Sequence, residues 1–369
     1  MAKKAQPETG GDFSKNLARL AESINKDFKM EVVIAGSGAT LSDVKIWVPT
    51  SSVMLNYLLG GGVPVGRILE IFGDPSHGKS TLVEHMMIGF QRYPGISILL
   101  DSESTWSRPR AMAMGHDPDR HLSFECDTIE LGFTVAKKTI LKARAPESKF
   151  PPEMPIGIFW DTVSASQTEN EKANDIYKEG MADKARKIRA ACRDFSFFLP
   201  RMNASLIFVS QTIADIKSPI PGQKKSASGG EAIKFWSSKR LKTWVSGKFE
   251  YPFKGAGVIC NVETIKDKIH PPRKRIEVPV LYATGIHNGY ELLTYLIDNS
   301  DLAEMSGGRV HIPDFPIEGE EITFYMKQLP AIMEKYPDLI AHFRACADKI
   351  WHGVETKPPQ KDDEEAEED

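Results

Sequence analysis

Apolar residues along this chain occur in two patterns, short continuous runs and longer stretches with one apolar position every three or four residues. Five continuous runs, of five to seven residues each, lie between positions 67 and 211: 67–72, 96–101, 123–127, 156–161 and 205–211. Most of them are separated by stretches long enough for a helix. Near-continuous apolar strands between helices are typical of a mainly parallel sheet covered on both faces. The pattern therefore predicts an α/β fold of that kind.

The pattern changes on both sides of this region. Apolar residues spaced by three and four predict an amphipathic helix over 13–28, with Phe13 and Leu17 on its apolar face. Beyond Gly230, longer β-like runs at 241–253, 257–266 and 275–283 predict an antiparallel extension of the sheet. From about Tyr290, two helical patterns surround a short β-like segment, which predicts a small α+β domain.

Composition excludes several classes of protein. The chain has 369 residues, of which 41% are hydrophobic and 26% charged, enough apolar material for a sizeable core. No stretch approaches the ~18 to 20 unbroken apolar residues of a membrane span, and residues 1–15 lack the apolar middle typical of a secretory signal. The four cysteines lie far apart in the sequence, which argues against a zinc site or a disulfide framework. We therefore expect a cytoplasmic protein with no membrane partner.

Charge becomes informative only when its distribution is considered. The net charge is −3, but seven of the last eight residues are acidic, and the rest of the chain carries +4. A run of like charges repels itself and stays disordered. Two interpretations of this tail remain open: a solubilising segment, and a polyanion that competes with DNA for a basic groove.

One motif carries clear chemistry. The sequence matches G-x-x-x-x-G-K-[ST] after a predicted strand and before a predicted helix, the context that a phosphate-binding loop needs. The glycines let the backbone wrap an anion, the lysine reaches the terminal phosphates and the hydroxyl binds Mg²⁺. The predicted nucleotide-binding residues are Gly73, Asp74, Pro75, Ser76, His77, Gly78, Lys79, Ser80 and Thr81. ATP and Mg²⁺ are the expected cofactors.

Polar side chains at other strand ends complete a hydrolytic site. Asp161 ends the run 156–161 and could hold the metal, although an aspartate capping a strand end is the simpler interpretation. Glu103 follows the run 96–101 and could polarise water; alone it would be an ordinary loop acid. Gln211 ends the run 205–211 and could sense a γ-phosphate. Strand ends in such a sheet all point to the ligand crevice, so we expect the three side chains to meet.

Basic and flexible segments follow these strands. The stretch 212–228 has two prolines and three lysines, shows no periodicity and ends at Gly229-Gly230, so we expect a long functional loop. The helix predicted before this stretch carries Arg186, Arg189 and Arg193, whose spacing places them on one face as a basic stripe. A solvated charged face would explain the stripe; so would a track for single-stranded nucleic acid that tolerates many sequences.

Three longer segments of this chain resemble the bacterial RecA recombinases: GGGVPVGRILEIFGDPSHGKSTL, SGGEAIKFWSSKRL and VETIKDKIHPPRKRIEVPVLYATGI. The resemblance covers about residues 13–290. It implies a RecA-like P-loop ATPase core, a helical filament on single-stranded DNA, strand exchange with a homologous duplex, and ATP bound between neighbouring subunits. The unusual loops indicate a divergent member, for which a phage genome is one candidate source; the compartment would then be the host cytoplasm.

The resemblance also implies roles for individual residues. Glu103 would be the catalytic glutamate and Gln211 the γ-phosphate sensor, with Lys79 as phosphate ligand. Lys266 and Lys268, which alone would read as a solvated strand edge, match a lysine pair that reaches the neighbour's ATP. The implied metal ligands are Ser80 and Asp161, the base contacts Arg110 and Tyr282, the interface aromatic Phe235, and the DNA contacts Met181, Arg186, Arg193, Ile216, Gly229 and Gly230.

The sequence departs from the family at three places. Ile213 and Asp215 stand where the second DNA loop is usually basic, and Ile220 stands where an aromatic residue is usual. Lys217, Lys224 and Lys225 could compensate. The adenine-stacking tyrosine is replaced by Arg110, or in function by Trp106.

The resemblance and the spacing together predict four parts. They are an N-terminal tail with an oligomerisation helix and strand (1–48), the ATPase core (49–289), a small C-terminal domain (290–358) and an acidic tail (359–369). Three functions stay open. The first is a DNA-dependent recombinase ATPase. The second is a ring motor or accessory repair ATPase, and the third a DNA-coating filament or mediator that scarcely hydrolyses ATP.

Overall fold

The computed structural model describes residues 10–28, 43–173, 181–214, 225–227, 230–250, 255–313 and 321–351. It divides into two units, Met1–Lys45 and Ile46–Asp369. In the first unit, α1 (Gly10–Phe28) is the predicted amphipathic helix, and Phe13, Leu17 and Leu20 are exposed on it. None of the described helices combines the length and apolarity needed to cross a membrane.

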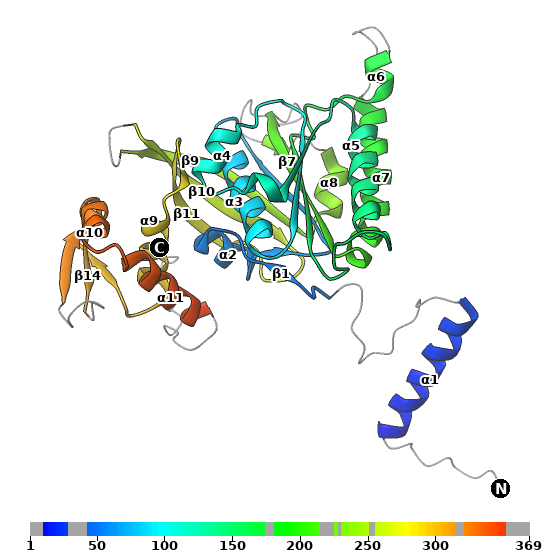
Figure 1. Cartoon of the computed structure of the whole chain (residues 1–369), viewed down its shortest axis with the longest axis horizontal. Helices are drawn as coiled ribbons and strands as arrows, with labels where there is room; N and C mark the ends of the chain where they lie inside the picture. Colours follow the sequence, from blue (N-terminus) through cyan, green and yellow to red (C-terminus); the bar gives the residue numbers. More distant parts are fainter. Residues whose placement is uncertain are drawn as a thin grey trace, which may run out of the picture. The chain divides into compact units, whose positions relative to one another are not determined.

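The second unit is built on a ten-stranded sheet (Figure 1). Its order is β12 (Gly285–Ile286), β11 (Arg275–Leu281), β10 (Gly257–Asp267), β9 (Lys239–Phe249), β3 (Ile68–Gly73), β7 (Ala204–Ala214), β6 (Ile156–Asp161), β4 (Ile96–Asp101) and β5 (His121–Glu125), with β8 (Lys225–Ala227) paired to β7. The strands from β9 to β5 are parallel, and those from β9 to β12 are antiparallel. The predicted fold class is confirmed.

Helices cover both faces of the sheet because alternate strand residues point to opposite sides. The helices of this unit are α2 (Val53–Leu59), α3 (Lys79–Arg92), α4 (Arg108–Ala113), α5 (Ile129–Ala143), α6 (Glu169–Ala173), α7 (Met181–Arg201), α8 (Gly230–Trp236), α9 (Asn288–Asn299), α10 (Leu329–Lys335) and α11 (Leu339–Trp351). Ile158 packs in one core with α5, α7 and α8, and its neighbour Phe159 packs in another with α2 and α3. Short 3₁₀ turns lie at Pro118–Arg120 and Met326–Gln328.

Two expectations from the apolar pattern are wrong in detail. The strand expected at 123–127 is β5, two residues earlier, and all five of its residues are exposed or half-buried because β5 lies at the sheet edge. The stretch 212–228 was expected to be a long loop, and only 212–214 and 225–227 of it lie among the described residues. Instead, β7 extends to Ala214 and pairs with the antiparallel β8. The extension of β7 and the strand β8 could not be predicted, because the stretch has no alternating apolar pattern that would indicate a strand.

The C-terminal part shares a core with the ATPase part. A three-stranded sheet of β13 (Glu304–Ser306), β14 (Arg309–Ile312) and β15 (Ile322–Tyr325) packs with α9, α10 and α11. Buried residues of α9 and α11, such as Leu293 and Phe343, belong to the same apolar cluster as Leu55 and Leu58 of α2. A small ladder of β1 (Trp47–Val48) and β2 (Val63–Pro64) completes the fold.

A buried carboxyl group joins these two parts. Glu291 of α9 is fully buried and accepts hydrogen bonds at the N-terminus of α2, from the Ser52 hydroxyl at 2.5 Å and the Val53 N–H at 3.3 Å. The α2 helix thus has its first donors satisfied from another helix. Burial raises the pKa of Glu291 to about 7, against the opposing effect of the Ser52 hydrogen bond.

Replacing Glu291 with glutamine should change how stability depends on pH. The folded pKa of about 7 lies above the ordinary value of 4.5. Stability from the protonated carboxyl group is therefore present below about pH 4.5 and lost as the pH rises through 7. Urea unfolding should show the wild type losing up to about 3 kcal/mol relative to the variant between pH 5 and pH 8.

The matched control is Glu277→Gln, at an exposed position of β11. It should keep the pH dependence of the wild type. Equal pH dependence for wild type and Glu291→Gln would contradict the assignment of a buried ionisable cap.

Candidate nucleotide site

The phosphate-binding loop forms the turn between β3 and α3. A Cβ atom at Gly73 would collide with Thr243 of the neighbouring strand β9, and Gly78 has φ of 77°, so both glycines are required by the backbone. The helix begins at Lys79, whose Nζ donates to the Asp74 carbonyl at 2.7 Å. Burial lowers the pKa of Lys79, while Asp161 and Glu103 act in the opposite direction. The loop thus connects a strand to the start of a helix, which is the context that a phosphate-binding loop needs.

Sheet register brings the predicted strand-end groups to this loop. Gly73 is paired with Gln211 across β3 and β7, and Asp101 with Asp161 across β4 and β6. Glu103 Oε1 accepts hydrogen bonds from Gln211 Nε2 at 3.0 Å and from the Thr162 hydroxyl at 2.8 Å. The predicted water-polarising acid and the predicted phosphate sensor are therefore in direct contact.

Asp161 and Ser80 form the candidate metal site. Desolvation raises the pKa of Asp161 to about 6, and a hydrogen bond from the Ser80 side chain opposes this. Across the described part of the chain, no group of three or more His, Cys, Asp or Glu side chains could hold a metal ion. Mg²⁺ in nucleotide sites needs only one or two protein groups, since phosphates and waters complete its shell. The Ser80–Asp161 pair fits that requirement.

A candidate base site lies beside the start of α3. The Arg110 guanidinium donates to the Tyr282 carbonyl at 2.9 Å and to the Thr81 hydroxyl at 2.8 Å, and the Tyr282 side chain is 58% exposed. Trp106 instead donates through its indole N–H to the buried Glu84 at 3.1 Å. Of the two residues that could replace the usual tyrosine, Arg110 is thus the one that adjoins Tyr282.

The lysine pair contacts the C-terminal end of α8. Lys266 Nζ donates to the carbonyls of Lys234 at 2.6 Å and Phe235 at 2.9 Å, and Lys268 Nζ donates to Phe235 at 3.2 Å. Phe235 itself is 66% exposed. Burial and then the adjacent Lys268 charge lower the pKa of Lys266 to about 8. The structure thus groups the predicted trans-acting cations with the predicted interface aromatic.

The basic stripe lies on the outer side of α7. Arg186, Arg189 and Arg193 line a cavity of about 580 Å³ together with Phe235 and Trp236 of α8. The opposite face of α7 is in the core, where Ile188, Cys192, Phe195 and Leu199 are at most 2% exposed. Met181 begins α7 and Gly230 begins α8. Ile216, Gly229 and the acidic tail 359–369 lie outside the described residues.

Sequence reasoning missed several polar partners of this site. Thr162 holds Glu103 as described above, and its position directly after Asp161 was the available signal. Thr212 donates a side-chain hydrogen bond to Asp74, so the phosphate loop also contacts the residue after Gln211. Lys184, on the same helix as the arginine stripe, was also not singled out, although its side chain donates to the Ser164 carbonyl. No sequence period marks such contacts, because they join segments far apart in the chain.

Comparison with known proteins agrees with this geometry. Residues 15–287 match the family model described as the RecA N-terminal domain. Protein RecA of Syntrophus aciditrophicus (strain SB) is 27% identical over 359 residues, 97% of this chain and 98% of the relative. Protein RecA of Acholeplasma laidlawii (strain PG-8A) is 30% identical over 328 residues, 88% of this chain and 95% of the relative. Because the family model spans most of the chain and these relatives match it nearly end to end, the chain belongs to the RecA family.

Proposed function

We propose that this protein is an ATP-dependent recombinase. It assembles on single-stranded DNA as a helical filament, pairs that strand with a homologous duplex, and hydrolyses ATP at subunit interfaces when DNA is bound. The observation that carries this proposal is the contact between Glu103 and Gln211 at strand ends beside the phosphate loop. The four cysteines are free, which supports the expected reducing cytoplasm.

The roles follow from position and charge. Lys79 and the amides of the turn bind the phosphates, and the Ser80–Asp161 pair would hold Mg²⁺, which neutralises charge on the phosphates. Glu103 would accept a proton from water. Gln211 would exchange its hydrogen bond to Glu103 for one to the terminal phosphate, because an amide can donate to either. Through this exchange of hydrogen-bond acceptor, the position of Gln211 would depend on whether ATP is bound.

Charge stabilisation from a neighbouring subunit completes the site. Lys266 and Lys268 are held by carbonyls at the end of α8, whose first residue, Gly230, belongs to the predicted DNA loop. Cations supplied in trans stabilise charge that develops during phosphoryl transfer, as an arginine finger does. Hydrolysis then depends on assembly, and assembly on DNA.

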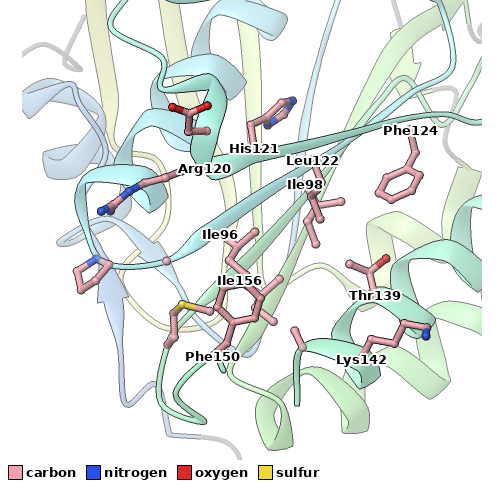
Figure 2. A pocket seen from close by; sticks show the side chains of 15 residues that line it. Ile96, Ile98, Arg120, His121, Leu122, Phe124, Thr139, Lys142, Phe150 and Ile156 are labelled. Carbon is pink, nitrogen blue, oxygen red and sulfur yellow. The ribbon is translucent and has the colours of Figure 1, made fainter. Parts of the chain in front are cut away.

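The second unit carries a surface suited to such assembly. An apolar groove of about 660 Å³ runs beside the edge strand β5, and side chains of β4, β5 and α5 surround it (Figure 2). Leu122 and Phe150 are 43% and 50% exposed there. The apolar face of α1 on another copy is the occupant we propose, because its exposed Leu17 and Leu20 need a partner of this character.

Replacing Glu103 with glutamine should separate binding from hydrolysis. The amide keeps the hydrogen bond geometry but cannot accept a proton, so DNA-stimulated ATP hydrolysis should fall at least ~100-fold. Binding of single-stranded DNA with ATP should remain. Glu125→Gln, at the end of β5, is the matched control and should hydrolyse ATP normally. Unchanged hydrolysis in Glu103→Gln would point to a passive DNA-coating filament; DNA-independent hydrolysis by the wild type would point to a ring-type or accessory ATPase.

Replacing Arg186 and Arg193 together with alanine should weaken binding of single-stranded DNA. Each lost phosphate contact should flatten the log-log salt dependence of the affinity by roughly one unit. Fluorescence anisotropy across a salt series measures this. Arg201→Ala, at the other end of α7, should leave the slope unchanged, and an unchanged slope in the double variant would refute the assignment of the stripe.

Leu17→Asp and Leu122→Asp should each block assembly. The first places a charge on the apolar face of the docking helix, and the second places one in the groove. Sedimentation with ATP should show both variants as monomers. An equimolar mixture still offers one intact helix and one intact groove, so it should form dimers that cannot extend. Filaments from either single variant would contradict the proposed contact.

A further inference from the structure

Lys184 lies two residues before Arg186, the first of the arginines proposed to bind DNA, yet its side chain contacts the nucleotide end of the sheet. Its Nζ donates to the carbonyl of Ser164 at 2.8 Å and to that of Ser166 at 2.6 Å. Both serines belong to the segment directly after Asp161. Burial lowers the pKa of Lys184, and the Glu171 charge acts in the opposite direction. Such a buried cation is costly without its acceptors.

Ser164 connects Lys184 to the predicted phosphate sensor. The backbone N–H of Gln211 donates to the Ser164 hydroxyl at 3.3 Å, and the N–H of Val163 donates to the Val209 carbonyl at 3.2 Å. The segment 162–166 is therefore attached to the end of β7. A shift of Gln211 toward a terminal phosphate would move the residue that Lys184 holds.

Ser166 connects the same lysine to the segment that carries Glu103. The Ser166 hydroxyl lies 2.7 Å from the Ser102 hydroxyl, and the Trp160 indole N–H donates to Ser102 at 2.9 Å. The Ser102 N–H also donates to the Asp161 carbonyl at 2.9 Å. The segments that carry Gln211 and Glu103 are thus both hydrogen-bonded to residues whose carbonyls bind Lys184.

At its other end, this network is attached to a rigid helix. α7 is a 21-residue helix whose inner face is buried through Ile188 and Cys192. Arg186 and Arg193 lie on that helix, and Arg186 is held by an ion pair to Asp183 at 2.7 Å. A movement of Lys184 therefore also moves Arg186 and Arg193, because a packed helix such as α7 shifts as one unit.

We propose that Lys184 is a positioning residue that couples the nucleotide state to the affinity of α7 for single-stranded DNA. With ATP bound, Gln211 and Ser164 shift together, and Lys184 transfers that shift to α7. The coupling is separate from the loop that follows Gln211. The inference rests on the proposed function, since it requires that the chain bind DNA more tightly with ATP than with ADP.

Lys184→Met tests this coupling, because methionine has similar length and cannot donate hydrogen bonds. Dissociation constants for single-stranded DNA are measured with a non-hydrolysable ATP analogue and with ADP. The ADP-to-ATP ratio of these constants should fall roughly tenfold, within the usual range for allosteric coupling. Affinity with ADP should stay unchanged. Lys184→Arg retains charge and donors and should restore most of the ratio.

Lys187→Met is the matched control, since it removes the same charge three residues along α7, where Lys187 pairs with Asp183 at 2.7 Å. It should change affinity equally in both nucleotide states. Ser164→Ala tests the path from its other end and leaves α7 intact. It should lower the ratio alone and add little to Lys184→Met, because both break one path.

The inference is overturned if Lys184→Met and Lys187→Met weaken DNA binding by the same factor in both nucleotide states. It is also overturned if Lys184→Met keeps the wild-type ratio. A wild type that binds DNA equally with ATP and ADP would refute the proposed function itself, so the two failures are distinguishable.

Discussion

The register of the parallel strands is the constraint on which the rest of this structure depends. Hydrogen bonding aligns Gly73 with Gln211 and Asp101 with Asp161, so the phosphate loop, the candidate metal ligand and the candidate sensor end at one edge. A shift of one residue in any of these strands would send the terminal side chain to the opposite face. Close packing in both cores resists such a shift, because it would exchange buried side chains of different size between the two cores.

A second level of organisation connects that edge with the surface. Short polar side chains, among them Thr162, Ser164 and Ser166, fill the space between the strand ends and the first turn of α7. In a low-dielectric interior, hydrogen bonds of this kind have defined partners and geometry, and an unmade one is costly. The site therefore has few independent parts, which is the property that a protein needs if one ligand is to influence another.

The fold could be predicted from sequence to the extent that it depends on local patterns. The apolar runs located β3, β4, β6 and β7, and the glycines and lysine of 73–80 located the turn into α3. The edge strand β5 was misplaced by two residues because it is not buried on both faces. The antiparallel pairing of β7 with β8 was missed, because no apolar period marks it in the sequence.

The candidate site was predictable in its members and less so in its contacts. Strand-end position was enough to expect that Asp161, Glu103 and Gln211 meet, and the roles carried over from the family remain predictions. The carbonyl contacts of Lys184 and Lys266 could not be expected, because a charged residue on a helix or strand edge usually faces solvent. These lysines differ from solvated lysines only by their contacts with carbonyls of distant chain segments, and such contacts become visible only in the folded structure.

The shared core between α2 and the helices α9 and α11 has a practical consequence for anyone who trims this protein. Removing residues beyond 289 would strip the cover from Leu55 and Leu58 and leave the first turn of α2 without Glu291. A shortened chain would then expose a hydrophobic surface and would aggregate. Loss of activity in such a fragment would report a damaged scaffold, and the contribution of this region to DNA handling is better judged from surface substitutions.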